Sequence, residues 1–407
     1  MLLLHTADWH LGHSLHDLDR HPEHALFLAW LLDRLEERRV DALLVCGDVF
    51  DASNPPARAL AQWFGFLAEA RRRLPRLQIV AIAGNHDSAA RLDAPGPLLE
   101  ACGLRVVGGP RAEPAAMVVP LLDAGGRPAA RVLAVPFLRP GDLPRVEPGP
   151  GEDPASACVR AFYTRAAAAA RAQAGPDEAL VALGHCHLAG GLSSETSERR
   201  LVTGGLEGLA AEALPAATYV ALGHLHLAQR VGVEHVRYAG SPLPLSLDER
   251  TYRHQVLLVT LDGPRLAGIE PLPVPRARQI VRLPEEGALP PAALLERLRT
   301  LAPPGDGGLP PLLDLAVELS APSPTLRREV EEALGDKPFR LARLQLRYPG
   351  HAGPACQREL CCPLRELAPE EVLRLAWQAR FPGEPPEPLR AAYQELVAEA
   401  RAAGEKP

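Results

Sequence analysis

The residues best able to do chemistry fall into five short polar groups within the first 226 positions, and each group follows an apolar run. Their side chains are carboxylates, an amide and imidazoles, with no Ser or Cys placed as a nucleophile. Hard oxygen ligands mixed with imidazoles suit Mn²⁺, Fe or Zn²⁺. Seven such ligands exceed the needs of one ion, so we expect two ions that share a bridging carboxylate. The candidate ligands are Asp8, His10, Asp48, Asn85, His185, His224 and His226.

The elements that must position these residues can be inferred from hydrophobic periodicity. The apolar runs that predict strands cover residues 2–5, 42–46, 78–83, 131–137, 179–183 and 219–222. Helical patterns cover residues 24–39, 56–73 and 155–174, with apolar stripes opposite charged faces. Strands that alternate with helices predict an α/β layered fold. A single Gly-His or Gly-Asp pair would be weak evidence, but five groups in one order, each after a strand, make a strong signal.

The pattern changes where Pro271, Pro273 and Pro275 predict a domain boundary. Strand-like runs at 279–283, 312–319 and 342–348 and helix-like runs at 291–301 and 326–334 then predict a small α/β unit without candidate ligands. A tail with two helical stretches follows over residues 368–403. Its apolar positions are Leu373, Trp377, Leu389, Tyr393, Leu396 and Val397. These positions either pack on the chain's own domain or dock on a partner helix.

Length and charge limit the possible functions. The chain has 407 residues, enough for two or three units, and a net charge of −6. No overall positive field attracts nucleic acid, so one interpretation is a protein that does not bind DNA. The other interpretation is that arginine clusters at residues 71–73 and 199–200, or a partner, supply the positive surface.

Other features of the sequence favour a cytoplasmic protein. No apolar run reaches the length of a membrane span, and the first residues run into Asp8 as a strand rather than as a signal peptide. The seven cysteines are scattered, which is typical of reduced thiols. Cys356, Cys361 and Cys362 lie near His351, but their spacing matches no common zinc site, so incidental thiols are the favoured interpretation.

The motifs together resemble the calcineurin-like metallophosphoesterases and, among them, the bacterial SbcD family of nuclease subunits. The segments that carry this resemblance are LHTADWHLG at residues 4–12, CGDVFD at 46–51, AGNHDS at 83–88, YVALGHLH at 219–226 and YAGSPLPLS at 238–246. The resemblance is specific over about residues 1–260 and only general in the rest of the chain.

This resemblance implies a four-layer β-sandwich flanked by helices over residues 1–272 and a small α/β capping domain that contacts DNA over residues 276–349. It also implies C-terminal helices over residues 364–405 that dock on an SbcC-like coiled-coil ATPase. The implied activity is that of a DNA nuclease with two divalent ions, for which Mn²⁺ is expected. It would work as a homodimer, cutting duplex ends exonucleolytically and single strands or hairpins endonucleolytically.

Two other functions compete with this one. The first is a stand-alone phosphoesterase that acts on nucleotides or phosphoproteins, which would need neither the small unit nor the amphipathic tail. The second is a non-enzymatic scaffold, which the complete set of ligands disfavours.

The seven ligands are expected to divide between two ions. The first ion would take Asp8, His10 and His226, the second would take Asn85, His185 and His224, and Asp48 would bridge them. Residues two apart after a strand end can point the same way. Asp8 and His10 must do so to bind the same ion. Two ions about 3.5–4 Å apart activate a water and polarise a phosphoryl oxygen. The implied reaction is in-line hydrolysis of a phosphodiester without a covalent intermediate.

His86 is expected to act in catalysis, because it follows Asn85 and would point away from that residue's ion. Its imidazole would protonate the leaving oxygen or stabilise the phosphoryl charge, and Asp87 would orient it by accepting the other ring N–H. Asp51 stands where archaeal and eukaryotic relatives often carry a second active-site histidine, whereas bacterial members tend to have Asp there.

The remaining histidines carry weaker expectations. His5 is expected in the core or just behind the ligands. A solvated loop and helix start is expected to hold His13, His16, His21 and His24. His187, two residues after His185, is interpreted as an outer-shell group or a surface residue in preference to a metal ligand. Residues 241–246 are expected to form a loop near the site.

Overall fold

The computed structural model describes residues 1–149, 152–192, 208–302, 308–348, 369–378, 381 and 383–402. The chain divides into two compact units, Met1–Val281 with Pro303–Asp314 and Pro338–Arg343, and Arg282–Ala302 with Leu315–Lys337 and Leu344–Pro407. The cysteines and histidine considered for zinc, and the arginines at 199–200, lie outside the described residues.

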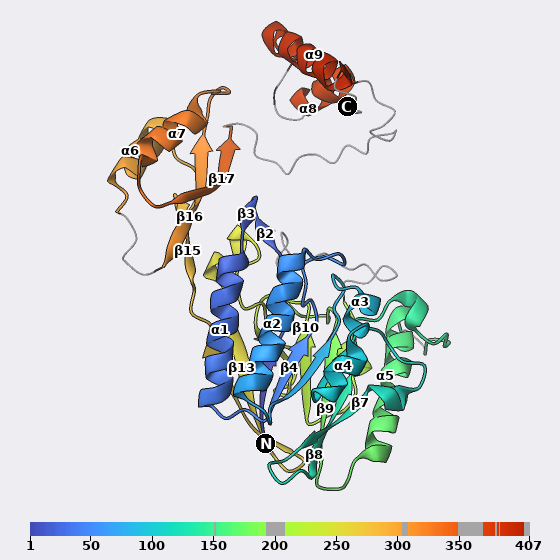
Figure 1. Ribbon diagram of the computed structural model, residues 1–407. Helices are drawn as coiled ribbons and strands as arrows, with labels where there is room; N and C mark the ends of the chain where they lie inside the picture. The colour runs from blue at the N-terminus through green and yellow to red at the C-terminus, as the bar shows by residue number, and fades with distance from the viewer. Residues whose placement is uncertain are drawn as a thin grey trace. The chain divides into compact units, whose positions relative to one another are not determined.

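The first of two large sheets has six strands in the order β14-β13-β1-β4-β5-β6 (Figure 1). Its strands are β1 (Leu2–Thr6), β4 (Ala42–Cys46), β5 (Gln78–Ile82), β6 (Leu104–Val107), β13 (Gln255–Asp262) and β14 (Arg265–Pro273). Strands β1, β4, β5 and β6 are parallel, and β13 and β14 continue the sheet antiparallel. The carboxyl ends of three ligand-bearing strands therefore meet at one edge.

The second sheet also has six strands, in the order β11-β12-β10-β9-β8-β7. Its strands are β7 (Val118–Leu122), β8 (Pro128–Ala134), β9 (Ala179–His185), β10 (Tyr219–Gly223), β11 (Gln229–Arg230) and β12 (Val236–Tyr238). Strands β8, β9 and β10 are parallel neighbours. This sheet therefore also brings its ligand-bearing strand ends together.

The two sheets pack face to face around a shared apolar core, with Leu44 and Val80 from one sheet and Val181 and Ala221 from the other all buried. Helices α1 (His21–Glu37) and α2 (Ala57–Arg73) cover the outer face of the first sheet, as Figure 1 shows. Helix α5 (Pro154–Gln173) packs on β8 of the second sheet. The four layers confirm the predicted fold class.

Burial of the sheets on both faces explains why the strands could be predicted from apolar runs in the sequence. Every residue of β4 and β9 is buried, and a strand buried on both faces reads as an unbroken apolar run. The three-proline segment does not interrupt the sheet at once, because β14 continues through Pro271 and Pro273. An edge strand tolerates proline because its outer N–H groups need no ladder partner.

Smaller elements complete the first unit and the rest of the chain. Two short helices, α3 (Ala89–Asp93) and α4 (Gly96–Ala101), contact β6, and β2 (Ser14–Leu15) pairs with β3 (Leu18–Asp19). A three-stranded sheet has the order β15-β16-β17, with β15 at Arg278–Leu283, β16 at Leu309–Glu318 and β17 at Arg340–Arg347.

The helices predicted in the last third of the chain are also present. They are α6 (Pro291–Thr300), α7 (Leu326–Leu334), α8 (Pro369–Gln378) and α9 (Glu387–Ala402). Among the described residues, no helix has both the length and the apolar character needed to cross a membrane.

Candidate metal centre

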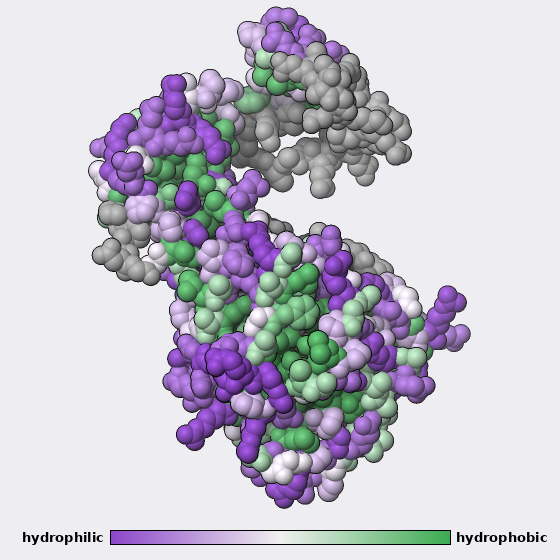
Figure 2. Space-filling model, in the orientation of Figure 1, coloured by the Kyte–Doolittle hydropathy of each residue, from purple (hydrophilic) through white to green (hydrophobic). Residues whose placement is uncertain are grey.

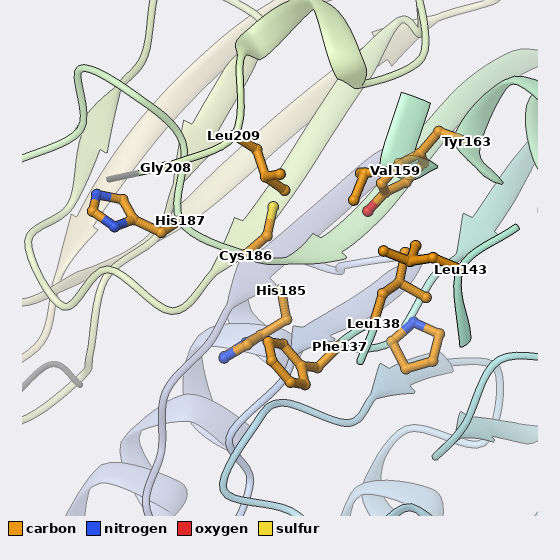
Figure 3. A pocket seen from close by; sticks show the side chains of 11 residues that line it. Phe137, Leu138, Leu143, Val159, Tyr163, His185, Cys186, His187, Gly208 and Leu209 are labelled. Atoms are coloured by element: carbon orange, nitrogen blue, oxygen red, sulfur yellow. The ribbon is translucent and has the colours of Figure 1, made fainter. Parts of the chain in front are cut away.

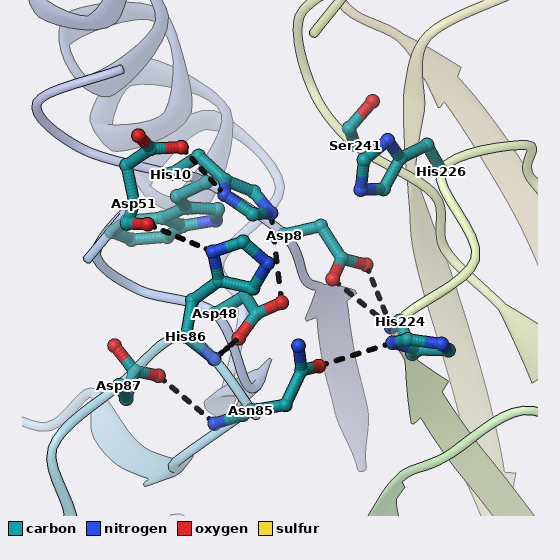
Figure 4. Close-up of polar contacts among 12 residues, drawn as sticks. Asp8, His10, Asp48, Asp51, Asn85, His86, Asp87, His224, His226 and Ser241 are labelled. Atoms are coloured by element: carbon teal, nitrogen blue, oxygen red, sulfur yellow. Dashed lines mark hydrogen bonds and ion pairs between the residues drawn. The ribbon is translucent and has the colours of Figure 1, made fainter. Parts of the chain in front are cut away.

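The seven predicted ligands come together at the carboxyl ends of β1, β4, β5, β9 and β10, and Figure 4 labels all of them except His185. Backbone hydrogen bonds hold the ends of β1 and β4 in step, because Asp8 N–H donates to Gly47 O at 3.0 Å and His10 N–H donates to Asp48 O at 3.0 Å. The amide of His224 donates to both carboxylate oxygens of Asp8, at 3.0 and 3.1 Å. This bond ties the second sheet to the first across the site.

Four of these residues adopt backbone conformations that L-amino acids avoid. Their φ angles are 54° at Asp8, 47° at His10, 47° at Asp48 and 104° at His224. A left-handed conformation costs free energy at a residue with a Cβ, and it persists only where the surrounding structure enforces it. Such residues cluster at functional sites, so this concentration indicates that the loops are shaped for their side chains.

Two of the motif glycines are needed for space as well as for the turn. A Cβ on Gly84 would collide with the Asp48 carboxylate, and one on Gly47 would collide with the His185 ring. Gly47 also has a φ of +86°, which a side chain would strain. The glycines next to the ligands therefore let one ligand lie directly over the backbone of the next strand.

The side chains form two groups with the geometry of metal sites. Ligand atoms in each group lie within 4.8 Å of one another, and the groups are Asp8 with His10 and His226, and Asp48 with His185 and His224. The Asn85 amide oxygen lies 3.0 Å from His185 Nε2 and 3.1 Å from His224 Nδ1, so it adjoins the second group.

Asp48 belongs to the second group and also approaches the first. Its Oδ2 is 3.3 Å from His185 Nε2 and 3.6 Å from His10 Nε2. A carboxylate in this position can contribute to both ion sites, which is the arrangement that the sequence predicted. The assignment of the seven residues as ligands remains a prediction.

Neighbouring acceptors orient three of the histidine rings. The Nδ1 atoms face Cys46 O at 2.9 Å from His185, a Glu249 carboxylate oxygen at 2.9 Å from His226, and an Asp51 carboxylate oxygen at 3.1 Å from His10. An Nδ1–H that donates to such an acceptor leaves the Nε2 lone pair for a metal ion. All three rings are therefore set in the tautomer that binds metal.

Two further observations fit a cation at this place. In the described part of the chain, His10 Nε2 is buried without a hydrogen-bond partner, although it lies in the middle of the cluster. Burial raises the pKa of Asp8 to about 7, and the nearby Asp48 carboxylate adds to this rise. Burial also opposes the ionisation of Asp48, yet the His185 ring lowers its pKa. A cation at the centre would offset the cost of burying the ionised carboxylates of Asp8 and Asp48.

His86 lies beside the ligands, with its ring centroid 4.8 Å from that of His10. Its Nδ1 donates to the main-chain oxygen of Asp51 at 2.8 Å, and its amide donates to Asp48 Oδ1 at 2.8 Å. His86, His10 and Asp48 also form a third group close enough to hold a cation. The ring is thus at the site, and its role as proton donor stays a prediction.

The prediction that Asp87 orients His86 is wrong. Asp87 is buried and accepts hydrogen bonds from the amides of Gly84, Val49 and Phe50, at 2.9, 3.1 and 2.9 Å. It clamps the two loops that follow β4 and β5. His86 is instead held by Asp51, whose main-chain oxygen accepts from its ring and whose carboxylate contacts the rings of His10 and His13.

The other histidines divide into core and surface residues. His5 is buried against Tyr219 and Leu222, as expected. His24 was expected in solvent but is fully buried, and its Nε2 contacts the Trp9 main-chain oxygen at 2.8 Å. His13 is held by Asp51 rather than solvated, and His16 is exposed as expected. His187 belongs to none of the metal-binding groups of the described residues.

The loop at residues 241–246 lies near the site, as predicted. Ser241 N–H donates to His226 O at 3.0 Å, but the Ser241 hydroxyl donates to Leu243 O at 2.9 Å and so braces its own loop. Glu249, which the sequence did not indicate, receives Leu245 N–H at 2.8 Å as well as the His226 ring. A lone glutamate 23 positions after a histidine carries no local signal, because only the loop between them brings the two together.

Comparison with known proteins agrees with this geometry. Residues 1–228 match the family described as calcineurin-like phosphoesterase, and residues 276–381 match one described as type 5 capsule protein repressor C-terminal domain. A protein of Rhodobacter capsulatus, named as the SbcD component of the nuclease SbcCD, is 38% identical over 370 residues, which cover 87% of this chain and 89% of the relative. The chain belongs to the SbcD family of calcineurin-like phosphoesterases.

Two other members of the SbcD family show the same relationship. The Escherichia coli K12 protein is 33% identical over 281 residues, 68% of each chain, and the Bacillus subtilis protein is 36% identical over 265 residues, 64% of this chain and 66% of the relative. Both carry the same name as the Rhodobacter protein. These matches confirm the resemblance inferred from the motifs and the prediction of a metal-dependent nuclease.

Proposed function

We propose that this SbcD-family chain hydrolyses DNA phosphodiesters with two divalent ions, of which Mn²⁺ is the expected metal. The observation that carries the proposal is the pair of buried ligand groups, in which the Asp48 carboxylate of the second group also approaches His10 of the first. Asp8, His10 and His226 would hold the first ion, and Asn85, His185 and His224 would complete the second. When bound, the ions would polarise the phosphate and activate a water for in-line attack.

The chain's own residues supply the rest of the chemistry. Because Asp51 O holds Nδ1–H of His86 at 2.8 Å, the Nε2 side of the ring is available to the substrate. A protonated Nε2 would donate its proton to the leaving oxygen of the cleaved strand. The clamp made by Asp87 would keep the loops of Asp48 and Asn85 from shifting as charge develops.

The substrate is proposed from the relatives and from the rest of the chain. The relatives are named as components of the nuclease SbcCD, so duplex ends, single strands and hairpins in DNA are the proposed substrates of this chain. The small domain at residues 276–349 is proposed to contact DNA and the helices at 364–405 to bind an SbcC-like ATPase. Leu389 and Leu396 on α9 are 40% and 63% exposed, which supports a partner for that helix.

A homodimer in the cytoplasm completes the proposal. Leu26 on α1 is 52% exposed and Phe64 on the neighbouring α2 is 39% exposed. The face that α1 and α2 present in Figure 2 accordingly carries apolar side chains among polar ones. Exposed apolar residues on adjacent helices support a contact between two copies.

The experiment that tests the function compares DNA with small phosphomonoesters. The purified chain is expected to cleave a hairpin oligonucleotide in Mn²⁺ and to lose that activity in a chelator. The Asp48→Ala variant serves as the inactive control. A stand-alone phosphoesterase, the alternative, would hydrolyse nucleotides or phosphopeptides efficiently and leave the hairpin intact. That result would reject the nuclease proposal.

A further inference from the structure

The two ligand groups of the candidate metal centre have different surroundings. Beside the second group, His185 lines an apolar pocket together with Phe137 and Tyr163, and the volume of this pocket is only about 50 Å³ (Figure 3). Pockets that bind small organic molecules span about 300–1,000 Å³, so we assign this pocket no ligand. In the first group, by contrast, carboxylates face the outer nitrogens of the His10 and His226 rings.

His13, in the loop after β1, lies between these polar contacts. Its Nε2–H donates to Leu245 O at 3.1 Å, and its Nδ1 lies 3.0 Å from Asp51 Oδ1. Both oxygens are acceptors, so the ring bonds to both when each of its nitrogens carries a proton. The side chain is 18% exposed, and the amide of His13 donates to His10 O at 2.9 Å. The ring is therefore held at both ends.

Asp51 connects His13 to the first ligand histidine. A single carboxylate oxygen, Asp51 Oδ1, lies 3.1 Å from His10 Nδ1 and 3.0 Å from His13 Nδ1. The two rings also meet edge to face, with 6.5 Å between their centroids. Because the partner of a ligand's outer nitrogen sets the orientation of that ligand, a shift of His13 would be passed through Asp51 to His10.

Leu245 connects His13 to the other ligand histidine. Its main-chain oxygen accepts from the His13 ring, and its N–H donates to one carboxylate oxygen of Glu249 at 2.8 Å. The other oxygen of Glu249 faces His226 Nδ1 at 2.9 Å. Leu245 and Glu249 are both buried, which shields these bonds from competing water. A shift of His13 would therefore also reach the acceptor that orients His226.

We propose that His13 is a positioning residue for the first ion, an inference that rests on the two-ion function proposed above. The contacts form a circuit from His10 to His226 that runs through Asp51, His13, Leu245 and Glu249. The rings at its two ends approach the centre from opposite sides in Figure 4 and lie 5.4 Å apart between centroids. An ion bound by both rings needs them at a fixed separation, and the circuit holds that separation.

Other contacts should keep the loop at residues 241–246 in place when His13 is replaced. Arg20 donates to Pro244 O at 2.7 Å, and Ser241 N–H donates to His226 O at 3.0 Å. Loss of His13 should therefore loosen the circuit without unfolding the loop. The expected loss in affinity for the first ion is about three- to tenfold, the value of one hydrogen bond. That is less than the roughly 10–100-fold loss expected when an orienting acceptor itself is removed.

The test follows the binding of Mn²⁺ to the full-length metal-free chain by the electron paramagnetic resonance of the free ion. His13→Phe keeps a ring but donates to neither oxygen, so one of the two binding steps should weaken by about three- to tenfold. That step should be the one that His226→Ala removes. His13→Asn places an amide nitrogen near the position of Nδ1 and keeps the bond to Asp51, whereas His13→Gln places one near Nε2 and keeps the bond to Leu245. Both should weaken the same step less than His13→Phe does.

A matched control separates this role from general loosening of the fold. His235 is partly exposed and precedes β12, away from the carboxyl ends of the strands, so His235→Phe should leave both binding steps unchanged. Thermal unfolding of the metal-free variants shows which of them fold, and the Asn and Gln variants decide the question if His13→Phe does not. Parental binding of both ions, equal weakening of both steps, or weakening of the other step would overturn the positioning role. A parent chain that binds fewer than two Mn²⁺ ions would instead reject the two-ion function, and the positioning role with it.

Discussion

Replacing Glu249 by glutamine should weaken the binding of one metal ion and leave the other largely unchanged. The side chain is fully buried, and its two oxygens accept from His226 Nδ1–H at 2.9 Å and Leu245 N–H at 2.8 Å. Glutamine has nearly the same shape, but one oxygen becomes an NH₂ group. That group must oppose one of the two donors, so either the His226 ring changes its tautomer or Leu245 N–H loses its acceptor.

The size of the effect follows from which donor loses its acceptor. If the amide nitrogen faces His226, the ring proton moves to Nε2 and removes the lone pair that a metal requires. Loss of such an orienting partner lowers metal affinity by about 10–100-fold, which equals about 1.4–2.7 kcal/mol. If the amide nitrogen faces Leu245 instead, the buried Leu245 N–H is left without an acceptor, which costs about 1–3 kcal/mol in the free energy of unfolding. When the amide nitrogen faces His226, only metal affinity is weakened, so a high Mn²⁺ concentration should restore activity.

The assay is a titration of the metal-free chain with Mn²⁺. Binding is monitored by calorimetry or by the electron paramagnetic resonance signal of free Mn²⁺. Two binding steps are expected in the parent, with one shifted to weaker affinity in Glu249→Gln. Asp248→Asn is the matched control, because this neighbouring carboxylate is 43% exposed and pairs with Arg343 instead of a histidine. Parent-like affinity for both ions in Glu249→Gln, or equal weakening of both, would refute the proposed link from Glu249 through His226 to one ion.

Three other perturbations test the remaining parts of the site and the tail. Asp48→Ala should abolish hydrolysis while the chain keeps its fold, since the site lies at strand ends; near-parental turnover with Mn²⁺ would reject the shared carboxylate. His86→Ala should retain two ions but lose about 10²–10⁴-fold in activity, and an anomalous diffraction map that shows only one ion would make His86 a ligand. Deleting residues 365–407 should abolish co-purification with an SbcC-like ATPase but preserve thermal unfolding and Mn²⁺-dependent cleavage of a simple phosphodiester; unfolding of the truncated chain would show that the tail completes its own domain.

Several local features could be predicted from the sequence because neighbouring residues produce them. The strand β4 is buried on both faces, so its five residues form one apolar run with the predicted bounds. The α1 and α2 helices show their buried stripe in the 3.6-residue repeat. The ligands Asp48 and Asn85 stand directly after such runs, each beside a glycine, so their place at the ends of parallel strands followed from the chain order.

Contacts between distant segments were the features that sequence reasoning missed. Asp87 was assigned to its neighbour His86, but its carboxylate turns inward and accepts from two amides after β4 and one after β5. The loop of Asp51 instead supplies the acceptor for His86. His24 was placed in solvent because it stands at the expected start of a helix after a loop, yet the packing of α1 against Trp9 buries it.

The family, the order of the strands that carry the ligands and the seven candidate ligands could all be inferred from the sequence, because they depend on local patterns and motif spacing. The folded chain was needed to show which ring nitrogens of His10 and His185 face the centre of the cluster, that Glu249 orients His226, and that Asp87 joins the loops after β4 and β5. These features could not be read from the sequence because the hydrogen-bond donors and acceptors come from residues far apart along the chain. Their positions follow from the packing of two sheets and the loops between them.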